Sequence, residues 1–107
     1  MSTEENRGTR EFKWPVETMI NAINDLAELQ KGEVTSYDIQ QGKFSFEVEM
    51  YGFVWEYRFT VTDRGEDTSL VTLEIEGDVT KKEVRISRQL ALLESLLIGI
   101  SIDENSM

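Results

Sequence analysis

The first third of the chain predicts a short strand followed by an amphipathic helix. From Thr9 to Trp14, an extended chain places Arg10, Phe12 and Trp14 on one side, which suggests a short strand. The other side carries Thr9, Glu11 and Lys13. Between Pro15 and Lys31, apolar residues recur at intervals of three and four, which predicts a helix with one apolar side. Pro15 in the first turn and Gly32 just beyond the last turn mark the two ends of this helix.

After Gly32 the hydrophobic period changes to two and stays there as far as Glu76. Turn-forming residues interrupt this part of the chain three times, which predicts a meander of four antiparallel strands. The expected strands are approximately Glu33 to Ile39, Phe44 to Met50, Phe53 to Thr62 and Thr68 to Glu76.

The turns predict which residues of neighbouring strands are paired. If Tyr51-Gly52 is a two-residue hairpin turn, Met50 lies opposite Phe53. We further expect Val61 opposite Ser69, and Ile39 opposite Phe44. Paired residues lie on the same face of a sheet, so these registers collect seven of the ten aromatic residues on one face. The seven are Tyr37, Phe44, Phe46, Phe53, Trp55, Tyr57 and Phe59.

The stretch QLALLESLLIGI near the end of the chain belongs to a long final helix. Its apolar stripe, within roughly 80° of arc on a helical wheel, suits a helix that lies on a sheet. The stripe consists of Ile86, Leu90, Leu93, Leu97 and Ile100. Leu92 and Leu96 widen the apolar arc to roughly 160°, more than one sheet contact needs. The first helix, a second subunit or a bound apolar molecule is therefore expected to contact this shoulder.

Together these elements predict an α+β fold, in which a curved antiparallel sheet of β-α-β-β-β-β-α order packs on the long C-terminal helix. A chain of 107 residues fits one domain. We expect this domain to span residues 9–102, with disordered tails at residues 1–8 and 103–107.

Composition narrows the possible partners and chemistry. The formal net charge of −10 disfavours nucleic acid and anionic membrane surfaces, and suits a basic protein partner better. The chain has no cysteine and no histidine, which excludes disulfides, thiolate nucleophiles and the usual zinc ligands. The absence of cysteine also predicts a cytoplasmic location, because the disulfides that are typical of proteins in oxidising compartments cannot form.

The polar face of the predicted sheet carries a row of carboxylates. The expected registers pair Glu47 with Glu56 and Glu56 with Glu74. Arg58 is expected to lie diagonal to Glu47 and Glu56. A weak calcium or magnesium site or a docking face for a basic partner is one interpretation. Screening by water, salt and Arg58 explains the row without any site, and we predict no metal site. No acid, base or nucleophile lies on the inward face, so we predict no catalytic residue and no cofactor.

The segments REFKWPVETMINAI and GEDTSLVTLEIEG, with the long amphipathic final helix, resemble the START-like helix-grip superfamily, which includes the polyketide cyclase and Bet v 1-like proteins. The resemblance extends from about Thr9 to Ile100. It implies a bent sheet that grips the last helix and encloses a cavity for a hydrophobic ligand. It also leaves an enzyme of the cyclase kind open. Small acidic secretion chaperones are a second comparison, which fits the charge but not the order of elements.

The sequence therefore predicts a non-enzymatic domain that holds a small hydrophobic ligand between the aromatic face and the C-terminal helix. The expected ligand-binding residues are Tyr37, Phe46, Trp55, Tyr57, Leu93 and Leu97. The alternative is an acidic chaperone-like or dimeric interaction domain with a filled core, whose interface would consist of Leu92, Leu96 and Ile98.

Overall fold

The computed structural model describes residues 7–77 and 79–105, and the side chains of residues 7–77 and 79–99. Its elements follow the predicted order: β1 (Arg7–Phe12), α1 (Val16–Leu29), β2 (Glu33–Asp38), β3 (Lys43–Met50), β4 (Phe53–Gly65), β5 (Thr68–Gly77) and α2 (Lys82–Asn105). The strand β1 begins before the expected domain boundary, and α2 continues to Asn105 beyond the other boundary. The rest of the two expected tails, residues 1–6 and 106–107, lies outside the described residues.

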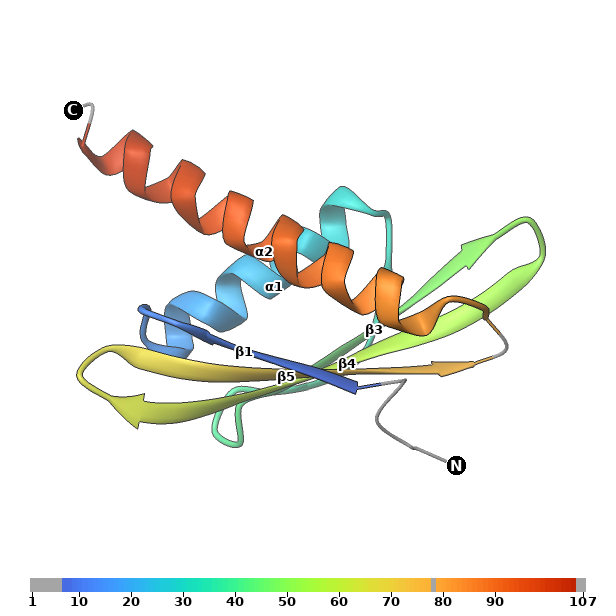
Figure 1. Ribbon diagram of the computed structural model, residues 1–107, viewed down its shortest axis with the longest axis horizontal. Coiled ribbons are helices and arrows are strands. Elements are labelled where there is room, and N and C mark those ends of the chain that lie inside the picture. Colours follow the sequence, from blue (N-terminus) through green and yellow to red (C-terminus); the bar gives the residue numbers. More distant parts are fainter. Residues whose placement is uncertain (1–6, 78, 106–107) are drawn as a thin grey trace.

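The strands form one antiparallel sheet in the order β1-β5-β4-β3-β2. The first strand thus returns to pair with the last one, where Arg10 lies opposite Val71. Both helices lie on the same face of this sheet, and α2 crosses over the strands (Figure 1). The predicted α+β fold class is confirmed.

Local chemistry explains where α1 begins and ends. Pro15 is its N-cap, and the Pro15 carbonyl accepts the Met19 N–H at 3.0 Å. At the other end Lys31 adopts a left-handed φ of 57°. The Lys31 N–H donates to the Glu28 carbonyl and the Gly32 N–H donates to the Ala27 carbonyl, which is a Schellman ending. A Cβ on Gly32 would lie 2.5 Å from the Phe46 ring, so glycine lets the chain pass close to the core.

The registers confirm one predicted hairpin and correct two pairings. Met50 lies opposite Phe53, and Tyr51 and Gly52 have the positive φ angles of a tight hairpin turn. Val61 lies opposite Val71, not Ser69, because a bulge before Gly65 moves the turn to Glu66 and Asp67.

The second correction concerns the edge strand. Phe44 lies opposite Tyr37, not Ile39, because β2 ends at Asp38, where the Asp38 carboxylate accepts the Gln41 N–H at 3.2 Å. Both slips amount to two residues, which keeps paired side chains on their predicted faces. The exception is the start of β2, where a bulge between Val34 and Ser36 places Val34 opposite Phe46.

The core fills the space between the sheet and the two helices. Phe46 and Leu93 both have no exposed side-chain surface and belong to one hydrophobic cluster, as the predicted packing of the last helix on the aromatic face requires. The α1 residues in the cluster are Met19, Ile20, Ala22, Ile23, Leu26 and Ala27. The described part of the predicted α2 stripe is also buried: Ile86, Leu90, Leu93 and Leu97. The Ile100 side chain lies outside the described side chains.

Candidate functional site

The helices do not cover the whole aromatic face. The β3–β4 hairpin projects past the first turn of α2 (Figure 1), and Met50 and Phe53 near its tip are each more than half exposed. Tyr37 on the edge strand β2 is 56% exposed. Core side chains fill the centre of the face beneath the helices. Space for a ligand is therefore found at the edge of the area that the helices cover.

Two adjoining pockets lie between this hairpin and the first half of α2, and each has a volume of about 290 Å³. They share Met50, Trp55 and Arg85, and we call the pair the Trp55 groove. The inner pocket is lined by Gln30, Val48, Met50, Trp55, Tyr57, Arg85, Arg88, Gln89 and Leu92. The outer pocket is lined by Met50, Tyr51, Phe53, Trp55, Val79, Thr80 and Arg85.

The six predicted ligand-binding residues are divided among three environments. Trp55 and Tyr57 line the inner pocket of the Trp55 groove, where their rings meet edge to face with centroids 6.5 Å apart. Phe46, Leu93 and Leu97 are at most 1% exposed and pack in the core. The sixth residue, Tyr37, is exposed and leans edge-on against Phe44. The structure thus brings two of the six to the groove wall, with three others in the core.

Trp55 is the central residue of the groove, and its position is set by the neighbouring strands. It lies opposite Val48 on β3 and Gly77 on β5. Gly77 has a φ of 136°, and a Cβ there would lie 2.9 Å from the Trp55 Cα. The Trp55 side chain is only 5% exposed, yet its indole Nε1 is a buried nitrogen with no hydrogen-bond partner in the described part of the protein. Buried indole N–H groups usually have an acceptor, so this unpaired nitrogen is an exception in the wall of the groove.

The guanidinium of Arg85 lies over the Trp55 ring, 4.8 Å from its centroid. Its Nε donates a hydrogen bond to the Thr80 carbonyl at 3.0 Å, which ties the side chain to the loop before α2. A cation over an indole face is attracted to the ring's negative quadrupole. Arg85 is therefore held at the junction of the two pockets.

A pair of amides forms the base of the inner pocket. Gln30 at the end of α1 donates to the Gln89 side-chain oxygen at 2.7 Å, and Gln89 donates back to the Gln30 oxygen at 2.8 Å. Gln89 is only 4% exposed. The reciprocal bonds satisfy both amides in a nearly dry place and join the two helices.

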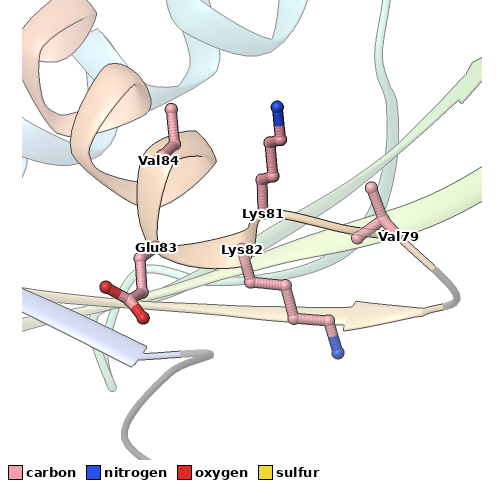
Figure 2. Close-up of a pocket in the computed structure, with 5 residues that line it drawn as sticks. All are labelled: Val79, Lys81, Lys82, Glu83 and Val84. Carbon is pink, nitrogen blue, oxygen red and sulfur yellow. The ribbon is translucent and has the colours of Figure 1, made fainter.

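Basic residues gather at the start of α2, which the sequence pattern alone did not single out. Lys81, Lys82, Arg85 and Arg88 account for four of the eleven basic residues. A third pocket of about 510 Å³ lies here, lined by Val79, Lys81, Lys82, Glu83 and Val84. Figure 2 shows the Lys81 and Lys82 side chains pointing to opposite sides of the chain. Because these ammonium groups diverge, they do not form a binding site for one small anion.

The polar face carries the predicted carboxylate row, with one correction. Glu47 lies opposite Glu56 as expected, but Glu56 lies opposite Glu76, because of the same two-residue slip that moved Val61. Arg58 forms ion pairs with both Glu56 and Glu76, and Thr35 donates to Glu56 at 2.6 Å.

Contacts within the carboxylate row shift the pKa values of Glu56 and Arg58. Burial raises the pKa of the Glu56 carboxyl, but hydrogen bonds from Thr35 and Arg58 and the charge of Arg58 outweigh it and hold the pKa below its usual value. The hydrogen bond to Glu56 also raises the pKa of Arg58. Within the described residues, no three carboxylates lie close enough to hold a metal ion.

The residues of the alternative interface lie on the shoulder of α2. Leu92 and Leu96 are half-buried against the core cluster, and Leu92 also lines the inner pocket of the Trp55 groove. Ile98 is 53% exposed. Among the described residues, no helix has the length and apolar character needed to cross a membrane.

Comparisons with known proteins support the fold. No protein-family model matches the sequence, and no curated protein matches it significantly. The crystal structure of CalU16 from Micromonospora echinospora is similar, with a TM-score of 0.63 and 13% identity over 81% of this chain and 70% of that chain. The two chains share a fold, which in this chain is the predicted helix-grip arrangement of an antiparallel sheet packed on a long C-terminal helix.

Two further solved structures show weaker likeness. TTHA0849 from Thermus thermophilus has a TM-score of 0.44 and 19% identity, covering 87% of this chain and 91% of that chain. A START superfamily protein from Mycobacterium smegmatis has a TM-score of 0.36 and 18% identity, covering 87% of this chain and 90% of that chain. At these scores neither adds to the argument.

Proposed function

We propose that this chain binds a small hydrophobic molecule in the Trp55 groove. The observation that carries the proposal is that the groove combines apolar walls with an unpartnered buried donor, the Trp55 Nε1. Small-molecule sites are typically apolar clefts with a few fixed polar groups, starting at volumes of about 300 Å³. The volume of about 290 Å³ for each pocket suits a small ligand. Phe46, Leu93 and Leu97 then support the groove wall from within the core.

We propose binding without catalysis at this groove. The chain has no histidine or cysteine, and no carboxylate is among the described residues that line either pocket. General acid–base and covalent catalysis therefore lack their usual groups there. Absence of cysteine also supports the cytoplasm as the proposed location.

Two matched leucines test the proposed function. Leu92 and Leu96 lie one turn apart on α2 and are both half-buried, but Leu96 is not among the residues that line the inner pocket. The assay titrates the uncharged fluorescent probe N-phenyl-1-naphthylamine into the wild type, Leu92→Trp and Leu96→Trp. We expect Leu92→Trp to fill the groove and weaken binding at least about tenfold, a loss of about 1.4 kcal/mol. Leu96→Trp should bind as the wild type does, and equal behaviour of the two variants would refute the groove as the site.

A homodimer through Leu92, Leu96 and Ile98 is the second candidate. It is favoured by the exposure of Ile98 and by the last turns of α2, which extend past the sheet in Figure 1. Because Ile98 is on the surface, Ile98→Glu should leave the fold intact. Sedimentation velocity should then show a wild-type dimer that dissociates in Ile98→Glu. A monomeric wild type at high concentration rejects this candidate.

A further inference from the structure

The charge of the Trp55 groove is opposite to that of the whole chain. Acidic residues outnumber basic ones by 21 to 11. Nevertheless, the described residues of the inner pocket include Arg85 and Arg88 and no aspartate or glutamate. The described residues that line the outer pocket likewise include Arg85 and no carboxylate. A groove of this sign attracts anions and repels cations.

Three residues of the groove carry N–H donors that no acceptor in the described part of the protein meets. Arg85 uses its Nε for the Thr80 carbonyl, and its terminal nitrogens form no ion pair with a carboxylate of the described part. Arg88 likewise forms no ion pair there. The buried Trp55 Nε1 is a third donor without a partner. An arginine has five N–H donors and no acceptor, so oxygens of water or of a ligand must meet the free donors of the half-buried Arg85 and the exposed Arg88.

The two side-chain amides of the inner pocket bind each other and not the arginines. The side-chain oxygens of Gln30 and Gln89 accept each other's amide groups. The two amides are therefore paired with each other in the inner pocket, which also contains the arginine and indole donors. Apolar side chains, among them Met50 and Leu92, form the remaining wall.

From this pattern we infer that the ligand of the groove is an amphipathic acid, whose anionic oxygens are bound by Arg85 and Arg88 while its apolar body lies against Trp55 and Leu92. The inference rests on the proposed function of the groove and specifies its ligand class. Guanidinium groups bind carboxylates and phosphates through paired N–H···O bonds. The acid binds as a free molecule and not as part of a membrane surface. Each pocket is small, and an anionic bilayer repels a chain of net charge −10.

The test compares two eight-carbon probes that differ in charge. Octanoate and 1-octanol are titrated separately into the full chain at neutral pH by isothermal calorimetry. We expect octanoate to bind at least about tenfold more tightly, which corresponds to one charge-assisted hydrogen bond. Raising the salt concentration from about 0.05 M to about 0.5 M should weaken octanoate binding and leave 1-octanol binding unchanged.

Three arginine variants locate the head group. Arg85→Gln and Arg88→Gln should each remove most of the preference for octanoate. Arg85→Lys keeps the charge over Trp55 and should retain part of the preference. Arg64→Gln is the control, because Arg64 lies nine residues along β4 from Trp55, roughly 30 Å away in an extended strand. Thermal unfolding of every variant verifies that it is folded.

The outcomes separate this inference from the function on which it rests. If 1-octanol binds as tightly as octanoate, and the arginine variants change neither, the acidic head group is refuted while the apolar groove stands. If neither probe binds the wild type, the proposed function fails and the inference fails with it. If octanoate does not bind but vesicles of phosphatidylglycerol do, the basic residues serve a membrane surface, and the inference is overturned.

Discussion

The amide pair between the two helices gives a prediction in which two similar substitutions have unequal effects. Replacing Gln30 by leucine leaves the Gln89 amide, which is only 4% exposed, without its donor and its acceptor. Replacing Gln89 leaves Gln30, which is half-buried and still reaches the Leu26 carbonyl at 3.3 Å. An unsatisfied buried polar group costs about 1–3 kcal/mol, whereas a group that reaches water costs much less.

We therefore expect Gln30→Leu to lower the free energy of unfolding by about 2–3 kcal/mol and Gln89→Leu by about 1 kcal/mol or less. The double variant should recover most of the loss, because replacing both partners by apolar groups leaves no amide unsatisfied. Urea unfolding of the four proteins, followed by circular dichroism with comparison of m-values, measures these differences. Equal costs of the single variants, or a double variant that costs their sum, would refute the reasoning.

Three further predictions concern the core, the glycine opposite Trp55 and the polar face. Leu93→Ala should cost about 2–5 kcal/mol in urea unfolding, whereas Ile98→Ala should cost less than about 1 kcal/mol, because Leu93 is fully buried and Ile98 is exposed. Gly77→Ala should lower the melting temperature more than Gly52→Ala. Both glycines have positive φ, but a Cβ meets Trp55 at Gly77 and nothing at Gly52. The folded-state pKa of Glu56 lies below its unfolded value, so its contribution to stability is present above pH 4.5 and is lost as pH falls. Glu56→Gln should therefore lose less stability than the wild type between neutral pH and about pH 3, and an equal loss would contradict the assigned network.

The faces of the strands were predictable from sequence, except at Glu33 and Val34 before the bulge in β2, while the exact pairings were not. Alternation with a period of two assigns each side chain to a face, and a slip of two residues leaves that assignment intact. The position of the slip depended on the turn after β4. Several turn-forming residues compete there, and the bulge before Gly65 is a backbone feature that the residue pattern does not fix.

The groove was only partly predictable, because the pattern shows which face is apolar but not how far the helices cover it. Phe46 and Phe53 lie on the same face, yet Phe46 is buried and Phe53 is 56% exposed. Trp55 and Tyr57 were identified through their aromatic character. Arg85 was missed, because a helical wheel places it outside the apolar stripe. The concentration of basic residues at positions 81–88 of an acidic chain is the sequence signal that would have identified it.

The most direct test of the account observes the two tryptophans separately. Their indole N–H groups give two resolved signals in a ¹H–¹⁵N correlation spectrum, which Trp14→Phe assigns, since Trp14 is not among the residues that line the groove. Addition of octanoate should shift the Trp55 Nε1–H signal in the direction of a new hydrogen bond and leave the Trp14 signal in place. A Trp55 signal that stays unchanged at saturating octanoate would contradict the central claim that this groove is a binding site.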